Sequence, residues 1–372
     1  MDTRILSACC LSLCCWLSAC QQKSNEPAEQ ATPTPQATGV DMSEQNKTYW
    51  DTGSHALASS LNAAQKLQAL IRAFLANPSG DSLTAAQEQW IHTESAWQSF
   101  FFYSQWPVTL TDVYAPLSPL LFNIGARPIQ PGYLDYVGPY PYAGLVHDIS
   151  VPLSAESLEE QHGMMDAEAA ALGIYAIEFM LFGEQNTRPS SDYQPATTLT
   201  SAQREQGFQQ AIELPANRRR ELLNLQTDLL VAHLTALQTL WNDDSKNSIR
   251  SHWQRMSNDA QQVAMLSNLE RTTTHLLLEI ARATPNAQPA EPIDGKPLSP
   301  SALAQAVSSL KIASAWLVEP EPIDARACFD NVATQLRNAT TLEAWSDIYQ
   351  LFRTCANSDA SSTLPSLQEQ DG

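Results

Sequence analysis

The chain has 372 residues, a formal net charge of −19 and 43% hydrophobic residues. A chain of this length can bury one large hydrophobic core or two medium ones. The strong negative charge argues against a nucleic-acid partner, because it would repel the phosphates.

The N-terminus is typical of a bacterial secretion signal. Arg4 supplies a positive charge, and the apolar run at 5–19 is too short to span a bilayer as a stable helix. Residues 17–20 resemble a lipobox, which predicts a signal peptide over 1–19 and a lipid on Cys20. The residue after Cys20 is Gln21 rather than Asp, which indicates the outer membrane, facing the periplasm. An uncleaved N-terminal anchor is the alternative.

Two segments lack the side chains needed for a core. Residues 20–43 are rich in Gln, Pro and Thr and are predicted to be a disordered tether, because they bury too little apolar surface to offset the entropy of ordering. Residues 358–372 are small and polar and are predicted to be a flexible tail. No stretch after residue 19 is apolar and long enough to span a membrane, so attachment is expected at the N-terminus, through the lipid on Cys20.

Apolar residues recur every three or four positions through most of the remaining chain, which predicts an all-α protein. The expected helices cover about 44–76, 82–103, 154–161, 164–182, 216–242, 249–282, 300–317, 324–338 and 341–355. This order predicts two tandem helical bundles of the four-helix type. The first half is expected over 44–183 and the second over 216–357, with a crossover at 184–215.

The segment 105–157 differs from the rest of the chain. Its many prolines are expected to prevent long helices, yet it is rich in Trp, Tyr and Phe. A long, ordered connection of this kind is uncommon and often functional.

Two cysteines, Cys328 and Cys355, remain in the predicted folded part. In an oxidising periplasm they are expected to form a disulfide, which would contribute about 3 kcal/mol to stability. Two buried thiols are the alternative.

Several catalytic signatures are missing from the sequence. The chain has no HExxH, GxSxG or P-loop motif, and it has no CxxCH motif for haem. A thermolysin-like zinc peptidase and a cytochrome are therefore unsupported.

Glu178 is the leading candidate for a functional residue. It lies in the apolar run 173–183, with Tyr175 on the same side of the predicted helix. A buried carboxylate needs a partner or a raised pKa. Arg127, in an apolar loop, is one candidate partner.

Other polar residues are weaker candidates. Asp148 could either bind a ligand or cap a turn, while His162 and Asp166 are expected to pair near the start of the Glu178 helix. His275 lies on an apolar stripe and is expected to be a hydrogen-bonded core residue.

Five segments carry a family likeness: 127–135, 140–148, 152–158, 161–163 and 173–179. Together they resemble the imelysin-like family, whose members are also called insulin-cleaving membrane proteases. The likeness is dense over 105–190, where several Pro, Gly and Tyr positions match in order.

The resemblance implies two helical bundles, a periplasmic or outer-membrane location, and an association with iron uptake. It also implies partners among iron-uptake or redox proteins of the envelope. The family motif is GxHxxE. Gly173 and Glu178 match its glycine and glutamate, but Tyr175 stands at the histidine position.

This substitution changes the chemistry expected at the site. A neutral imidazole binds metals and acts as a base near pH 7, whereas a phenol with a pKa of about 10 does neither without strong perturbation. One hypothesis is that Tyr175 and Glu178 hold iron or another divalent or trivalent metal as a pair of oxygen ligands. The alternative is a simple hydrogen bond between the two side chains.

Three functions follow from these observations. The leading hypothesis is a lipid-anchored, non-enzymatic binding or accessory protein of iron acquisition. A metal-dependent peptidase of the imelysin type is the second. The third is an adaptor that contacts envelope proteins through the aromatic segment 105–157.

Overall fold

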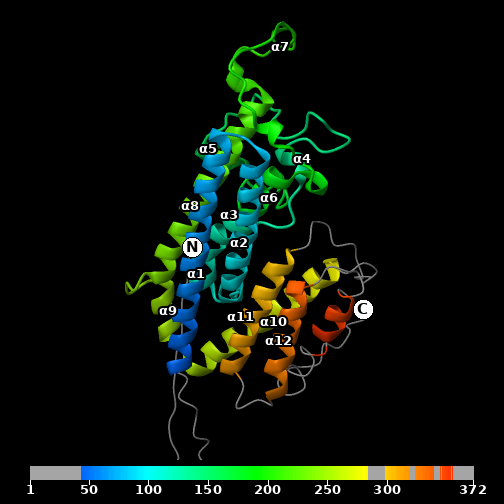
Figure 1. The fold of residues 1–372 in the computed structure, drawn as a ribbon. Helices are drawn as coiled ribbons and strands as arrows, with labels where there is room; N and C mark the ends of the chain where they lie inside the picture. Colours follow the sequence, from blue (N-terminus) through cyan, green and yellow to red (C-terminus); the bar gives the residue numbers. More distant parts are fainter. Residues whose placement is uncertain are drawn as a thin grey trace, which may run out of the picture. The chain divides into compact units, whose positions relative to one another are not determined.

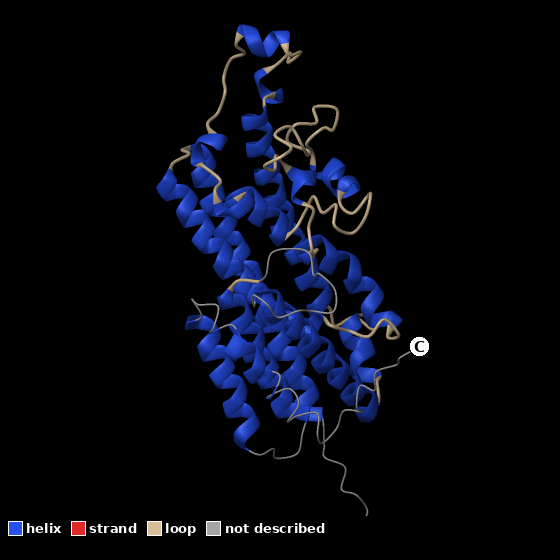
Figure 2. Ribbon diagram, turned by 90° about the vertical axis from the view of Figure 1, so that its right-hand side faces the viewer, coloured by secondary structure: helices blue, strands red, loops and turns tan. Residues whose placement is uncertain are grey.

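The computed structural model describes residues 43–283, 298–317 and 323–338, together with 344, 346–352 and 354. The predicted signal peptide, Cys20 and the predicted tail lie outside the described residues, as does the tether up to residue 42. The described part is all-α, as predicted, and contains no β-strand (Figures 1 and 2).

The α-helices are α1 (Ser43–Ala76), α2 (Gly80–Ser104), α3 (Thr111–Gly125), α4 (Pro131–Leu134), α5 (Ala155–Gln161), α6 (Ile174–Phe182), α7 (Ser201–Glu205), α8 (Pro215–Asn242), α9 (Ile249–Arg255), α10 (Asn258–Ala283), α11 (Pro300–Leu317) and α12 (Ile323–Asn338). Short 3₁₀ helices cover Glu184–Asn186, Ser190–Tyr193 and Ala211–Glu213.

Helix α1 follows directly from its apolar pattern. Its side chains at three- and four-residue spacing are buried, among them Leu57, Leu67 and Phe74. They pack against α2 and α8. At the N-terminal end, the ring of Trp50 stacks on that of Trp241 from α8, with the ring centroids 4.2 Å apart. These contacts fix the long helices α1, α2 and α8 against one another.

Helix α2 contacts two groups of helices along its length. Trp90 in its first half donates a hydrogen bond to the carbonyl of Ile174 in α6, over 2.8 Å. In its second half, the carbonyl of Ser99 accepts a hydrogen bond from Ser309 of α11, over 3.4 Å. The middle of α2 therefore lies between its contacts with α6 and its contacts with α11 (Figure 1).

The helix contacts group the elements differently from their order along the chain. Helix α8, which the sequence assigned to the second half, packs on α1, α3 and α6. Helices α10, α11 and α12 form the other group, in which α11 contacts both of its neighbours and α2. The predicted crossover at 184–215 is therefore not the border between the two groups of helices, because α8 follows it in the sequence but packs with helices of the first half.

Two predictions for helices outside the Glu178 segment were wrong. The prolines of 105–157 were expected to prevent long helices, but α3 runs for 15 residues with Pro116 and Pro119 inside it. Each proline removes one backbone hydrogen bond, and burial of α3 against α8 offsets that loss. The predicted helix 249–282 is interrupted, because Met256 is extended with ψ of 148° and separates α9 from α10.

The connection after α3 is held by arginines of α8. Arg219 donates to both carboxylate oxygens of Asp135, over 2.6 and 3.0 Å, and Arg188 pairs with the same carboxylate at 3.0 Å. Asp135 is completely buried. Arg218 donates hydrogen bonds to the carbonyls of Leu145, Val146, Asp148 and Val151. The connection is ordered through this fixed charge network.

Cys328 lies on α12, partly buried against the core. Cys355 falls outside the described residues, so the disulfide between the two remains a prediction.

Candidate functional site

Gly173 sets the approach of α6 to α3. Its φ is 96°, a backbone conformation that residues other than glycine rarely adopt. A Cβ at this position would lie 2.7 Å from the carbonyl oxygen of Ile124 at the end of α3. The glycine therefore lets the two chain segments meet closely, and it aims the first turn of α6 toward α2.

The Glu178 helix is shorter than predicted. It was expected to begin at 164, but α6 begins at Ile174. Residues 163–169 turn back instead, closed by a hydrogen bond of 2.9 Å from the Gly163 N–H to the Ala169 carbonyl. The site therefore lies in a helix of only 9 residues, held between α2, α3 and α8.

Tyr175 is buried in the first turn of α6. Its hydroxyl accepts a hydrogen bond from Nε2 of Gln98 in α2, over 3.1 Å. The guanidinium carbon of Arg127 lies 4.6 Å from the centroid of its ring, a cation–π contact. Burial raises the pKa of Tyr175 well above its usual value of 10, so the side chain is a neutral phenol. The hydroxyl meets Gln98 rather than Glu178.

Arg127 has a carboxylate partner that the sequence pattern did not reveal. It pairs with Glu279 of α10 at 2.9 Å. Glu279 is buried and also accepts hydrogen bonds from Arg282, over 2.5 Å, and from the N–H of Leu298, over 3.2 Å. Glu279, in the group formed by α10, α11 and α12, thus compensates the positive charge of Arg127 above the Tyr175 ring. Only the fold brings these distant segments of the chain together.

Glu94 is a second buried carboxylate near Glu178. It lies on α2, 1% exposed, and accepts a hydrogen bond from the N–H of Ser299 over 3.3 Å. Burial, reinforced by the nearby charge of Glu178, raises the pKa of Glu94 to about 7. The sequence carried one signal for this residue, because Glu94 falls on the face of α2 that buries Trp90 and Trp97.

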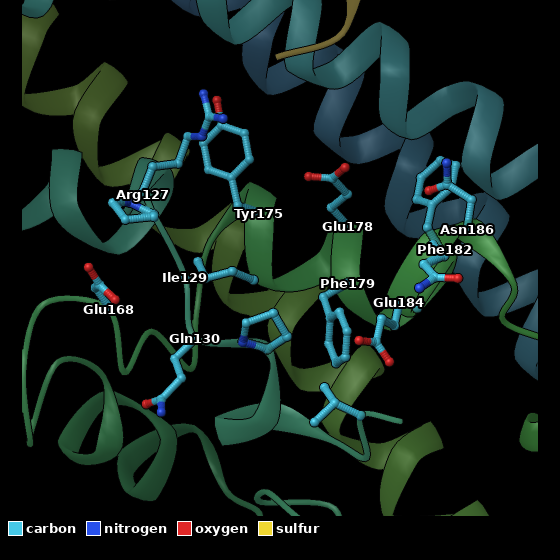
Figure 3. Close-up of a pocket in the computed structure, with 15 residues that line it drawn as sticks. Arg127, Ile129, Gln130, Glu168, Tyr175, Glu178, Phe179, Phe182, Glu184 and Asn186 are labelled. Carbon is cyan, nitrogen blue, oxygen red and sulfur yellow. The ribbon is translucent and has the colours of Figure 1, made fainter. Parts of the chain in front are cut away.

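A cavity of about 560 Å³ opens between α6, the loop after α3 and the turn after α6 (Figure 3). This volume lies in the range of small-molecule sites. Tyr175 and Glu178 project into it from the same side of α6. The lining residues are Arg127, Pro128, Ile129, Gln130, Pro131, Val137, Glu168, Tyr175, Glu178, Phe179, Phe182, Gly183, Glu184, Gln185 and Asn186.

Two other candidates have local structural contacts and do not line this cavity. Nδ1 of His162 accepts the N–H of Leu172 over 3.2 Å, and its Nε2 lies 3.3 Å from the Phe122 carbonyl. Burial lowers the pKa of His162, so it is a neutral linker between two segments. Asp148 accepts two hydrogen bonds from Ser150, which lower its pKa, and it therefore closes a turn.

The predicted pairing of His162 with Asp166 was wrong, because each side chain bonds to backbone groups instead. Asp166 accepts the N–H groups of Glu168 and Ala169, each over 2.9 Å, in the turn before α6. His275 was expected to be a hydrogen-bonded core residue, but its buried Nε2 has no hydrogen-bond partner among the described residues. Its ring instead packs at a tilt against Phe101, with ring centroids 4.5 Å apart. Burial lowers its pKa to about 4, so its ring is neutral at pH 7.

Comparison with known proteins agrees with the residues at this site. The family model for imelysin, a peptidase family, matches residues 53–317. The chain belongs to the imelysin family. The match spans the Gly173, Tyr175 and Glu178 positions of the motif as well as most of α1 and all of α2, α8 and α10. The resemblance seen in the sequence is thus confirmed.

A solved structure shares the imelysin fold. It is described as an imelysin-like protein from Psychrobacter arcticum 273-4, with a TM-score of 0.53 and 15% identity. The alignment covers 86% of this chain and 94% of the other. At this identity the likeness concerns the fold. No curated protein matches the chain.

Metal binding, which the imelysin motif suggests, does not fit the side chains at this position. Tyr175 is a buried neutral phenol, and the guanidinium of Arg127 lies over its ring. A metal cation here would meet that positive charge, and its ligand would first have to lose a strongly held proton. In the described part of the chain, no three His, Cys, Asp or Glu side chains are grouped so that they could hold a metal ion. The hypothesis of iron on Tyr175 and Glu178 is therefore disfavoured.

Membrane attachment was predicted through Cys20, which lies outside the described residues. Of the helices in the described ranges, none combines the length and the apolar character needed to cross a bilayer.

Proposed function

We propose that this imelysin-family chain is a non-enzymatic binding protein of the bacterial outer membrane, anchored by a lipid on Cys20 and serving iron acquisition. The observation that carries the proposal is the state of Tyr175. It occupies the histidine position of the motif, is buried, accepts a hydrogen bond from Gln98 and lies beneath Arg127. A neutral phenol held in this way supplies neither a base nor a metal ligand near pH 7.

The cavity supports the proposal that this site binds a small molecule. Tyr175 forms part of its wall, and Glu178 projects into a space large enough for a small molecule. A peptidase of the metal-dependent type would instead need a metal with an open position and a base able to activate water. The side chains at the motif positions fit the binding of a small molecule and do not fit metal-dependent hydrolysis.

The test compares hydrolysis in the wild type with two variants. The purified protein is incubated with insulin and with a mixture of unstructured peptides, with and without added Zn²⁺ or Fe²⁺. We expect no cleavage above that of a heat-inactivated sample. Metal-dependent cleavage that disappears in Glu178→Ala and increases in Tyr175→His would overturn the proposal in favour of the peptidase.

The anchor and the cellular process are tested separately. We expect the chain to incorporate labelled fatty acid and to fractionate with the outer membrane, and Cys20→Ala to abolish both. In the native bacterium, a deletion strain is expected to grow more slowly when iron is restricted and to recover with the wild-type chain. Equal growth of both strains under iron restriction would contradict the assignment to iron acquisition.

A specific observation keeps the adaptor function as a second candidate. In the aromatic connection, Tyr140 is 65% exposed and Tyr142 is 84% exposed. Exposed aromatic side chains are common at protein–protein contacts. An adaptor would retain an envelope partner in Glu178→Gln and lose it in a Tyr140→Ser, Tyr142→Ser double variant. The reverse pattern would support the pocket as the functional site.

A further inference from the structure

We infer that the cavity beside Glu178 binds a small organic cation, an ammonium or guanidinium group carried on an apolar body. The inference rests on the proposed use of this cavity for binding and adds the chemical class of the ligand.

The charge of the lining favours a cation. Among the described residues that line the cavity are three glutamates, Glu168, Glu178 and Glu184, against one guanidinium. That guanidinium, Arg127, already pairs with buried Glu279 at 2.9 Å. Opposite charge close to a partly enclosed surface attracts a charged ligand and raises its local concentration.

The carboxylates have different surroundings. Glu178 is half-buried and lies near Glu94, whose pKa it helps to raise. Glu168 and Glu184 are exposed, and Glu184 accepts the Gly138 N–H over 2.7 Å. A ligand cation would therefore meet Glu178 in the interior of the site, with two further negative charges near solvent (Figure 3).

The walls explain why the cation should be organic. Ile129, Pro131, Val137, Phe179 and Phe182 supply apolar and aromatic surface. Aliphatic and aromatic walls favour an apolar body, and aromatic faces also attract ammonium and guanidinium groups. A bare metal ion would leave most of this 560 Å³ cavity and its apolar surface without contacts.

The test uses probes of one shape and different charge. Calorimetric titrations of the full-length protein compare 4-phenylbutylamine, 4-phenylbutanol and 4-phenylbutyrate at low and high salt. We expect the amine to bind at least about tenfold more tightly than the other two, with weaker binding at high salt. Preferred binding of the butyrate, equal binding of all three, or no binding of the amine would overturn the inference.

Two carboxylate variants locate the binding. Glu178→Gln is expected to weaken binding of the amine by about tenfold and to leave the alcohol unchanged, because it removes only the charge. Glu221, which is exposed on α8 and does not line the cavity, serves as the matched control, and Glu221→Gln should bind the amine like the wild type. Equal weakening in both variants would contradict a site at Glu178.

Peptide probes distinguish the source of the ammonium group and separate this inference from the proposed function. The dipeptide Phe-Phe-amide is titrated with a free and with an acetylated N-terminus, and cleavage is followed in the same samples. Tighter binding of the free form without cleavage would extend the inference to peptide N-termini, whereas binding of the simple amine alone restricts it to small amines. Cleavage of either peptide would contradict the non-enzymatic function itself, whichever ligand charge the cavity prefers.

Discussion

Two carboxylates, Asp135 and Glu94, are almost equally buried in this protein but differ in their protonation. Asp135 is surrounded by His147, Arg188 and Arg219. Burial alone would raise the pKa of Asp135, but these hydrogen bonds and charges lower it to about 2. Among the described residues no comparable set of cations surrounds Glu94, and burial raises its pKa to about 7.

The fold thus separates charges that hold the structure together from charges beside the candidate site. The Asp135 cluster is ionised, closed and tied to the connection after α3, so it holds the loop from which Arg127 extends. The Glu94 region is where α2, α6 and α11 meet, and it lies beside the cavity that contains Glu178. A buried carboxylate with full compensation stabilises the fold, while one with partial compensation remains responsive to pH and to a ligand.

The largest effect is expected from breaking the Asp135 cluster. Asp135→Asn leaves two buried guanidiniums without their counter-charge and should lower the free energy of unfolding by about 3–5 kcal/mol. Chemical denaturation at pH 7 measures this loss. Asp244→Asn changes an exposed carboxylate and should remain within about 0.5 kcal/mol of the wild type. Similar values for both variants would contradict a stabilising role for the cluster.

The acid limit of the same cluster follows from its lowered pKa. The carboxyl titrates near 3.8 when unfolded and near 2 when folded, so Asp135 contributes stability above pH 4. This contribution, about 2 kcal/mol, is lost as the pH falls from about 4 to 2. In Asp135→Asn, the stability curve over this window should be correspondingly flatter.

Glu94 should show the opposite dependence. Its pKa is raised from 4.5 to about 7, so the folded state binds the proton more tightly and the contribution to stability falls as the pH rises from 4.5 to 7. Glu94→Gln should therefore gain up to about 3 kcal/mol relative to the wild type between pH 4.5 and pH 8. Denaturation curves at several pH values measure the difference between the two proteins.

His275 provides the control for this interpretation. Burial lowers its pKa from 6.5 to about 4, so its contribution to stability rises between pH 4 and pH 6.5 and partly masks Glu94. The rise should be clearer in Glu94→Gln than in the wild type. A wild-type and a Glu94→Gln protein with parallel curves would contradict the raised pKa of Glu94.

A smaller effect is expected at the glycine of the motif. Gly173→Ala places a Cβ close to the Ile124 carbonyl at a positive φ and should destabilise the protein by about 1–3 kcal/mol. Gly80, at the start of α2, has no atom within 4 Å of a Cβ built on it, so Gly80→Ala should be neutral or slightly stabilising. Thermal unfolding of both variants checks the contrast.

The smallest effect is expected from the Tyr175 hydroxyl. Tyr175→Phe keeps the ring under Arg127 and removes the acceptor of the Gln98 hydrogen bond, which should cost about 1 kcal/mol. The same substitution at Tyr142, 84% exposed, should have no measurable effect. A loss of several kcal/mol in Tyr175→Phe would indicate that the hydroxyl has contacts beyond the one to Gln98.

Much of the fold could be predicted from the sequence, because most of the helices are encoded by the local spacing of apolar residues. Apolar spacing predicts α1 and α8 well, and one glutamate in an apolar run marks α6 as the candidate site. The rest depends on contacts between distant segments. The pairing of Arg127 with Glu279 and the proximity of Glu94 to Glu178 arise only once α2, α6 and α10 are packed. No spacing rule within one helix contains that information.

The errors in the prediction have physical causes of the same kind. Prolines argued against α3, but tertiary packing against α8 outweighed their local cost. The start of α6 was placed too early because apolar and small residues before Gly173 continue a helical pattern, while the chain turns there. Local preferences are reliable where nothing opposes them, and they fail where packing or a tight approach dominates.

The metal content of the natively purified protein tests whether Tyr175 makes this a binding site without a metal. Elemental analysis and visible spectroscopy are applied to the wild type and to Tyr175→Phe. We predict no stoichiometric iron or zinc in either protein and no absorption band from a phenolate–iron contact. One equivalent of iron, with a charge-transfer band that disappears in Tyr175→Phe, would contradict the account.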